Sequence, residues 1–313
     1  MAQSIGKIIA ERTGINNLIS LLADELSGTE LNSLLLEVFS RRTQQLTAPE
    51  LLKQYEQNRF VQPAESNFIH LLEKSLQTLT CLSQHQFLPL QVAPLSQLGA
   101  CSVVATVDQD KVVSALRNCE VLSDATNALA MYICSQKKKQ KGNDASAHIK
   151  YCTTQRHVRS QPFQAKGFSP HFTIGCLVSS GTDTGNYAFE KKAIAEHFVA
   201  LQDVLTTVFN TGPVRFRLQQ RAGYPNAFIP AIEEYLHTRL PALKVTVDEN
   251  PGSNNYYKGL QFKAVVTLQQ RDFEIADGGL VTWTQQMLNN KKERFFISGF
   301  GLELLNKLEE GLL

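Results

Sequence analysis

The spacing of apolar residues predicts a group of helices in the first sixty residues. Apolar side chains recur every three or four positions over residues 18–26 and 31–39, which is the spacing of one helix face. Ser-Gly-Thr-Glu at 27–30 and Thr-Ala-Pro-Glu at 47–50 fit the capping box, in which a hydroxyl and a glutamate satisfy each other's backbone amides. No residue cluster in this module, residues 1–62, suggests chemistry, so we expect it to dimerise or to dock a partner.

The remainder, residues 63–313, is predicted to form one core domain. Amphipathic spacing predicts helices over 65–82, 125–134, 188–209 and 230–239 and a last helix that runs to Leu313. Alternating or continuous apolar runs predict strands over 103–107, 111–113, 171–178, 214–218, 244–247, 260–268, 273–276 and 295–297. Long strands joined by hairpins, with helices grouped around them, indicate an α+β fold with an antiparallel sheet flanked by helices.

Composition narrows the class of protein. Of 313 residues, 43% are hydrophobic and 19% are charged, as in soluble globular proteins. No apolar run is long enough for a secretory signal or a membrane span. The six cysteines are scattered without a C-x-x-C pair, which argues against a zinc ribbon or a disulfide framework and favours reduced thiols. We therefore expect a cytoplasmic protein with no metal site and no membrane partner.

Charge argues against broad nucleic-acid binding. The formal net charge is only +2, whereas nucleic-acid-binding domains carry a basic stripe or patch. The one dense basic run, Lys-Lys-Lys-Gln-Lys at 137–141, precedes a Gly-Asn-Asp turn signal. We expect a solvated loop there; contact with an RNA backbone is the alternative.

Motifs in the last third, and two further upstream, resemble those of one family. Asn-Asn-Tyr-Tyr-Lys-Gly-Leu-Gln-Phe at 254–262, Asp-Gly-Gly at 277–279 and Ile-Ser-Gly-Phe-Gly-Leu-Glu-Leu at 297–304 resemble, in order, the tyrosine-rich strand, the glycine turn and motif 3 of class II aminoacyl-tRNA synthetases of the histidyl type. Arg-His-Val-Arg-Ser-Gln at 156–161 is similar to motif 2, residues 121–127 to the Leu-Arg-Pro-Glu-Gly-Thr stretch, and Pro94 to the motif 1 proline. The resemblance covers roughly residues 65–313.

This resemblance implies a fold, a ligand and a set of binding residues. The fold would be the class II synthetase-like sheet, and the ligand an amino acid or a nucleotide, with ATP and Mg²⁺ as cofactors if activation persists. Asp124 and Thr126 would meet an amino group, and Arg156 an α-phosphate or carboxylate; Arg156 would be catalytic in an active enzyme. The implied ligand-binding positions are Asp124, Thr126, Arg156, Arg159, Tyr256, Tyr257, Gly278, Gly279, Gly299, Gly301 and Glu303.

Each of these positions also has a purely structural interpretation. The glycines are typical of turns where a sheet meets a helix, and Asp124 could be a helix N-cap. Arg156 could pair with a surface acid, Glu303 could favour the first turn of its helix, and His157 and His171 could be structural. Neighbouring residues of a strand point to opposite faces. We therefore expect no more than one of the two tyrosines in the pocket.

Three departures from the family pattern bear on activity. The motif 3 arginine is Leu304, the motif 2 glutamate is Val158, and the arginine before the tyrosine strand is Gly252. Each lost arginine removes a charge-assisted contact worth roughly 1.5–3 kcal/mol. Arg294 and Lys292 could substitute only by reaching around the sheet. The chain also ends shortly after motif 3, where the family continues into an anticodon-binding domain.

These departures predict a non-aminoacylating paralogue that binds an amino acid or a nucleotide. We expect it to be a homodimer formed through motif 1 that regulates or scaffolds a protein partner. The histidyl-like regulatory subunit of ATP phosphoribosyltransferase is a precedent in the family for such a degenerate core, but no residues tie this chain to that enzyme. The alternative is an active amino-acid-activating ligase with a non-tRNA acceptor. An RNA-binding module that uses residues 137–141 is a third hypothesis.

Overall fold

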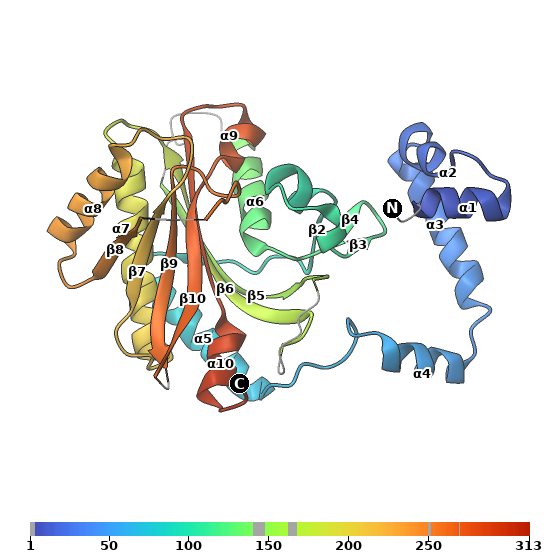
Figure 1. Cartoon of the computed structure of the whole chain (residues 1–313), viewed down its shortest axis with the longest axis horizontal. Coiled ribbons are helices and arrows are strands. Elements are labelled where there is room, and N and C mark those ends of the chain that lie inside the picture. The colour runs from blue at the N-terminus through green and yellow to red at the C-terminus, as the bar shows by residue number, and fades with distance from the viewer. Residues whose placement is uncertain (1–3, 140–147, 162–167, 250–251, 269) are drawn as a thin grey trace.

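A single eight-stranded sheet organises the core (Figure 1). The computed structural model describes residues 4–139, 148–161, 168–249, 252–268 and 270–313. In spatial order the strands are β1 (Leu88–Pro89), β5 (Ile149–Val158), β6 (His171–Thr182), β11 (Glu293–Phe300), β10 (Arg271–Val281), β9 (Leu260–Leu268), β7 (Arg215–Gln220) and β8 (Lys244–Asp248).

The pairing of these strands confirms the predicted α+β class and adds a detail at the edges. The six central strands pair antiparallel with their neighbours; in spatial order these are β5, β6, β11, β10, β9 and β7. Both edge pairs, β1 with β5 and β7 with β8, are parallel. Parallel neighbours need a crossover connection, and α8 (Phe228–Arg239) supplies it between β7 and β8.

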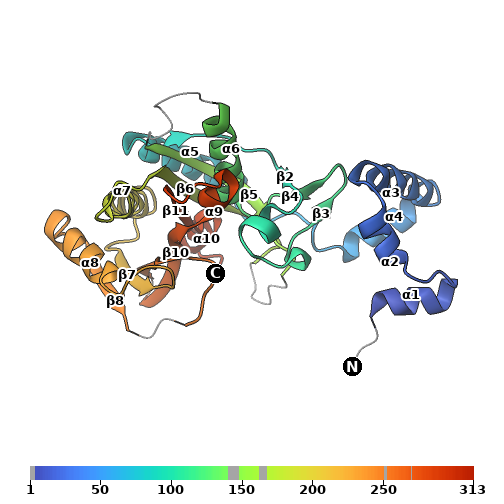
Figure 2. The same ribbon diagram turned by 90° about the horizontal axis from the view of Figure 1, so that it is seen from above.

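Helices cover both faces of the sheet (Figure 2). Helices α5 (Phe68–Gln84), α7 (Ala188–Asp203) and α10 (Leu302–Glu309) pack with α8 against the larger apolar core. Helices α6 (Ala125–Lys139) and α9 (Trp283–Leu288) cover the opposite face around a second cluster. No helix in the described part of the chain combines the length and the apolar character that crossing a membrane requires.

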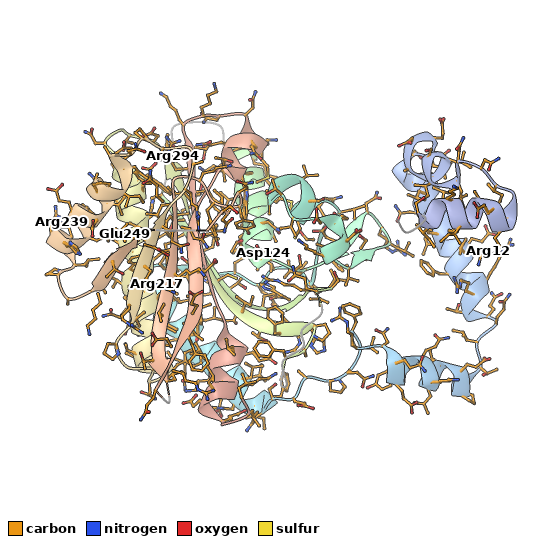
Figure 3. All side chains as sticks on the ribbon, in the orientation of Figure 1. Arg12, Asp124, Arg217, Arg239, Glu249 and Arg294 are labelled. Atoms are coloured by element: carbon orange, nitrogen blue, oxygen red, sulfur yellow. The ribbon has the colours of Figure 1, made fainter. Side chains whose placement is uncertain are left out.

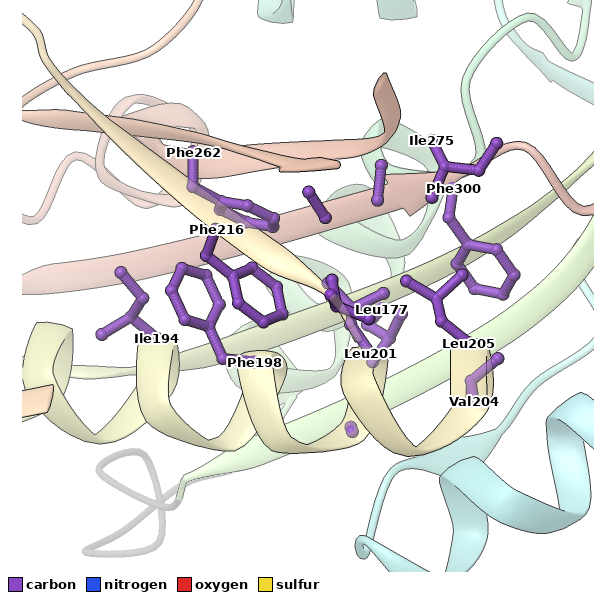
Figure 4. Packing of buried hydrophobic residues seen from close by; sticks show 14 of the residues in the cluster. Leu177, Ile194, Phe198, Leu201, Val204, Leu205, Phe216, Phe262, Ile275 and Phe300 are labelled. Atoms are coloured by element: carbon purple, nitrogen blue, oxygen red, sulfur yellow. The ribbon is translucent and has the colours of Figure 1, made fainter. Parts of the chain in front are cut away.

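Aromatic rings fill the larger core between α7 and the sheet (Figure 4). The rings of Phe198 on α7 and Phe216 on β7 stack with centroids 3.9 Å apart, and the Phe262 ring meets Phe198 edge to face at 4.8 Å. All three side chains are fully buried. Burial of such rings is worth roughly 1.5–3 kcal/mol each, so this contact fixes α7 on the sheet.

The N-terminal module consists of exposed helices. These are α1 (Ile5–Thr13), α2 (Leu18–Ser20), α3 (Gly28–Thr43) and α4 (Ala48–Gln57). Both predicted capping boxes are present, at Ser27 with Glu30 and at Thr47 with Glu50. None of these four helices contains a buried residue. Side-chain packing within this module therefore contributes little to its stability.

The predicted strands over 103–107 and 111–113 are wrong. Residues Ala100–Val104 form a π-helical turn and Gln109–Lys111 a 3₁₀ turn, beside a small sheet of β2 (Leu95–Gln97), β4 (Cys119–Val121) and β3 (Ser114–Ala115). The fully buried Glu120 carboxylate accepts hydrogen bonds from the backbone N–H groups of Gly99 and Cys101 at 2.9 and 3.1 Å. These charge-assisted bonds hold the turn and override the strand preference of the valines.

The predicted solvated loop at 137–141 is also corrected. Helix α6 continues to Lys139, and the Lys137 side chain is buried, with its Nζ 2.5 Å from the Glu293 carboxylate on β11. Lys141 lies outside the described residues. A buried lysine requires a paired anion, and Glu293 was too distant in sequence to be recognised as that partner.

Candidate functional site

A cavity of about 780 Å³ lies on the face of the sheet that α6 covers. It is lined by side chains from β5, β6, β10 and β11, by the loop that precedes β9, and by the start of α6. Asp124 lies where α6 meets the sheet (Figure 3). Of the implied ligand-binding positions, those that line the cavity are Asp124, Thr126, Arg159, Tyr256, Tyr257, Gly299 and Gly301.

Asp124 caps α6, as one of the two interpretations of the sequence expected, and it also lines the cavity. Its Oδ1 accepts hydrogen bonds from the backbone N–H of Thr126 at 2.8 Å and from Thr126 Oγ1 at 2.6 Å, which caps the first turn of α6. Its Oδ2 accepts from the Tyr256 hydroxyl at 2.7 Å. Burial opposes ionisation, but the bonds from Thr126 and Tyr256 and the nearby Arg159 charge hold the pKa of Asp124 below its ordinary value.

A second carboxylate, Asp277 on β10, lines the same cavity. It accepts hydrogen bonds from the Tyr257 hydroxyl at 2.6 Å and from Gln261 Nε2 at 2.9 Å. Burial raises its pKa above the ordinary value for an aspartate. The motif Asp-Gly-Gly at 277–279 was noted in the sequence for its glycines. The carboxylate is the member of that motif that faces the cavity.

Both tyrosines line the cavity, so the expectation that no more than one would do so is wrong. Residues 255–259 form bends, and β9 begins only at Leu260, so the alternation of a strand does not apply to them. The two rings contact edge to face with centroids 4.8 Å apart. Burial raises both hydroxyl pKa values well above 10.0. Tyr256 and Tyr257 therefore stay protonated and donate to the two aspartates.

His157 is a cavity residue that the sequence analysis assigned to structure. Its Nε2 accepts a hydrogen bond from the backbone N–H of Ala125 at 3.1 Å. Burial lowers the pKa of His157 to about 4, so the neutral ring carries its proton on Nδ1. Among the described residues, this buried Nδ1 has no hydrogen-bond partner. Because this donor is buried, an acceptor atom of a ligand could reach it only after the cavity wall moves.

Arg156 lies on the opposite side of β5 from the cavity. Its Nε donates to His171 Nδ1 at 2.9 Å, and its Nη1 lies 3.3 Å from Glu303 Oε2. Glu303 is buried and also accepts from the backbone N–H of Thr173 at 2.9 Å. The acid that pairs with Arg156 is thus a buried helix residue. Neither Arg156 nor Glu303 lines the cavity.

Strand alternation explains which motif 2 residues reach the cavity. His157, near the end of β5, and Arg159, which directly follows the strand, line it, whereas Arg156 and Val158 do not. The residues that line the cavity are therefore one position later than Arg156 and Val158, which the sequence resemblance matched to the arginine and glutamate of motif 2. A shift of one residue along a strand moves every side chain to the other face. A match to a short motif cannot exclude a shift of that size.

The four glycines fall into two pairs. Gly299 and Gly301 line the cavity. A Cβ on Gly278 would lie 2.3 Å from the carbonyl oxygen of Ile297, and one on Gly279 would lie 2.2 Å from that of Leu260. Gly278 and Gly279 therefore permit close packing of the strands and do not open toward a ligand.

Cationic side chains line the cavity, but the proposed substitutes for the motif 3 arginine do not. Lys111, Arg159 and Lys263 contribute to the wall. Arg294 donates from Nε to Glu190 at 2.8 Å, and Figure 3 shows it near the upper end of the sheet, away from Asp124. Leu304 packs against the larger core. Neither Arg294 nor Lys292 lines the cavity in the described part of the chain.

Arg221 is a second residue that the sequence analysis missed. It is buried at the end of β7, and its Nη2 donates to Gln219 and Gln261 at 2.7 and 2.6 Å. It also donates to the backbone oxygen of Gly252. Because Gln261 in turn donates to Asp277, Arg221 positions the cavity loop from behind. No local pattern marks Arg221 in the sequence.

Solved structures of class II synthetases share this fold. Histidyl-tRNA synthetase of S. aureus matches with TM-score 0.57 and 11% identity, over 76% of this chain and 67% of that chain. An ATP phosphoribosyltransferase regulatory subunit/histidyl-tRNA synthetase of Bacillus halodurans C gives 0.58 and 12%, over 79% and 82%. A putative threonyl-tRNA synthetase of Aeropyrum pernix gives 0.59 and 9%, over 77% and 59%. No protein-family profile and no curated protein sequence matches.

The chain therefore has the catalytic-core fold of the class II aminoacyl-tRNA synthetases. Structures of the histidyl type and of the phosphoribosyltransferase regulatory subunit are among those that share it. The fold that the motifs predicted is confirmed. At 9–12% identity, the likeness concerns the fold, and chemistry must be argued from the cavity itself.

Proposed function

We propose that this protein binds a free amino acid in the cavity and does not transfer it to tRNA. The observation that carries this proposal is the pair of buried aspartates, Asp124 and Asp277, each oriented by a tyrosine hydroxyl. The ionised Asp124 suits the α-ammonium group, because a buried cation needs a paired anion. Asp277 then suits an N–H donor on the side chain of the bound amino acid. Arg159, which lines the cavity, suits the carboxylate.

The same cavity lacks several features that amino-acid activation needs. Position 304 offers a leucine where a cation would stabilise the terminal phosphate, and Arg156 is engaged by Glu303. Asp124 and Asp277 already accept hydrogen bonds from neighbours, so they offer few free oxygens to Mg²⁺. These residues fit ATP with Mg²⁺ poorly, and we derive no reaction step from that cofactor. A regulatory protein that senses an amino acid fits them better.

A second candidate is an adenylate-forming ligase with an acceptor other than tRNA. It is favoured by Arg159, which lines the cavity and forms no ion pair within 4.0 Å among the described residues. A guanidinium without an anionic partner could neutralise the α-phosphate of a nucleotide.

A ligand screen and an exchange assay distinguish the two candidates. We expect one amino acid or a few related ones to raise the melting temperature, because a ligand that binds only the folded state stabilises it. We expect ATP–pyrophosphate exchange to stay at background with each of them. Exchange well above background with any amino acid would refute the regulatory proposal and support the ligase. A flat screen would refute both.

The first prediction concerns Asp124. Asp124→Asn keeps an N-cap oxygen for α6 but removes the anion that faces the ammonium group. A charge-assisted bond is worth roughly 1.5–3 kcal/mol, so affinity for the amino acid found in the screen should fall about 10- to 150-fold by calorimetry. The control is Asp272→Asn, which alters an exposed pair with Arg215 and should leave affinity unchanged. Equal affinities in both variants would contradict the assignment.

A further inference from the structure

A thiol, an imidazole and a carboxylate meet on the face of the sheet opposite the cavity. Cys81 is on α5, His85 is its C-cap four residues later, and Asp203 ends α7. One ligand atom from each of these residues lies within 4.8 Å of the other two. Four-residue spacing places Cys81 and His85 on one helix face. Two helices thus present three different metal-ligand types at one point.

The distances within this cluster resemble those of a metal site before metal binds. Asp203 Oδ2 lies 2.8 Å from His85 Nε2 and 3.4 Å from Cys81 Sγ. In a tetrahedral zinc site, bond lengths near 2.0–2.3 Å put neighbouring ligand atoms roughly 3.3–3.6 Å apart. To hold an ion, the distance from Asp203 to His85 must grow by about half an ångström. The distance from Cys81 to His85, which is at most 4.8 Å, must come into the same range.

The surroundings of the cluster allow an ion to enter and leave room for a fourth ligand. The side chains of His85 and Asp203 are 24% and 36% exposed, whereas Cys81 is buried. His85 also lines a hollow of about 400 Å³ beside the cluster. Of the charged groups around that hollow, Lys150 is paired with Glu196 at 3.3 Å. The charge of Lys150 is therefore compensated.

We propose that Cys81, His85 and Asp203 bind a zinc ion that joins the C-terminal end of α5 to the C-terminal end of α7. Cys81 Sγ, His85 Nε2 and Asp203 Oδ2 are the protein ligands, and water from the hollow completes the tetrahedron. The Cys81 thiol loses its proton to solvent as the sulfur–zinc bond forms. A soft thiolate with one imidazole and one carboxylate favours zinc or cobalt over Mg²⁺ or Ca²⁺.

This site is independent of the proposed amino-acid pocket. Cys81 belongs to the larger core, which is packed on the α7 face of the sheet, whereas Asp124 and Asp277 line the cavity on the α6 face. The ion would act on the scaffold by linking two helices that pack against each other. Either proposal can fail without the other.

Cobalt titration of the tag-free, metal-stripped full-length chain tests the site. Cobalt bound to a thiolate gives a charge-transfer band in the near ultraviolet, and we expect one equivalent to saturate it. Zinc should displace the cobalt, abolish the band and raise the melting temperature. Absence of a thiolate band at saturating cobalt would overturn the proposal.

Variants separate this cluster from other thiols and histidines. Asp203→Asn and His85→Gln change the more exposed ligands, and each should weaken cobalt binding at least tenfold; Cys81→Ser should abolish the band. The controls are Cys119→Ser, a free thiol elsewhere, and His148→Gln, which alters a nearby pair with Glu196. Both should bind as the wild type does. Unchanged binding in Asp203→Asn and His85→Gln, or a band that Cys119→Ser abolishes, would refute the assignment.

Discussion

At the residue scale, the site depends on which face of a strand each side chain occupies. His157 and Arg156 are adjacent, yet one lines the cavity and the other binds Glu303. Gly299 and Gly278 both lie in the motifs, yet only the first faces the cavity. The role of a residue in this site therefore depends more on the face of the strand that it occupies than on its chemical type.

Gly299 gives a direct test of the cavity as the binding site. An added Cβ would meet no atom closer than 3.7 Å, so the side chain of Gly299→Val should project into the cavity and occupy part of it. We expect the melting temperature to stay within a few degrees of the wild type, while amino-acid binding is lost by calorimetry.

Gly278→Ala is the matched comparison for this prediction. Its Cβ would lie 2.3 Å from a backbone oxygen, so the strands must move apart. We expect lower stability in Gly278→Ala, with the loss seen in chemical denaturation. Full binding by Gly299→Val would show that the ligand occupies another place.

At the element scale, buried polar side chains decide how helices sit on the sheet. Helix α6 is joined to β11 by Lys137 and Glu293. Helix α7 carries His197, whose ring nitrogens lie 2.9 Å from Ser179 Oγ on β6 and 2.6 Å from Ser298 Oγ on β11. These contacts give each helix one position on strands that apolar packing alone would specify less tightly.

Removing one partner of the ion pair between Lys137 on α6 and Glu293 on β11 should destabilise the folded protein. Lys137→Met leaves Glu293 buried without its partner, which costs about 3–5 kcal/mol in such sites. Lys137→Met combined with Glu293→Met replaces both charges with apolar groups, and we expect it to regain most of that loss. Urea denaturation of the three proteins measures both effects. A single variant as stable as the wild type would contradict the burial of this pair.

Because of His197, the free energy of unfolding should decrease as the pH is lowered. Burial lowers its pKa to about 3, whereas in the unfolded chain it takes up a proton below about pH 6.5. The contribution of the neutral, buried His197 to the free energy of unfolding is therefore complete above pH 6.5 and is lost as the pH falls toward 3. From about pH 7 to about pH 4.5 we expect the wild type to lose about 2–3 kcal/mol more than His197→Gln.

Denaturant titrations at both pH values check this expectation. His237→Gln, at an exposed position of α8, should follow the wild type. Parallel pH profiles for the wild type and His197→Gln would contradict a neutral, buried His197.

At the scale of the whole molecule, α5 presents an apolar stripe to solvent. Phe68, Ile69, Leu72 and Leu76 are between 53% and 70% exposed, and no described segment covers them. Exposed stripes of this kind mark interfaces. The homodimer expected from the sequence, through motif 1, stays a prediction, and we predict that this stripe takes part in its contact.

Sedimentation measurements test that assembly. We expect a dimer for the wild type and a shift toward monomer for Leu72→Glu combined with Leu76→Glu, because two buried charges oppose association. His237→Glu combined with Thr238→Glu, at exposed positions of α8, is the control and should remain dimeric. A wild-type monomer at high concentration would refute the homodimer.

Local signals in the sequence determined much of the fold. The capping boxes, the helical spacing of α5, α7 and α8 and the hairpin of β9 with β10 were all recognisable, because caps, periodicity and turns act over a few residues. The strands predicted at 103–113 failed because a buried Glu120 reorganised that segment. That contact spans about twenty residues and leaves no local pattern.

The sequence by itself also determined the chemistry available to the site: its aspartates, tyrosines, glycines and the missing motif 3 arginine at Leu304. Only the tertiary structure decided that Asp124 and Asp277 lie in one cavity, that His157 replaces Arg156 at its wall, and that Lys137 is buried. The reason is physical. A strand presents alternate side chains to opposite faces, and which face encloses a cavity depends on the elements that pack against it from elsewhere in the chain.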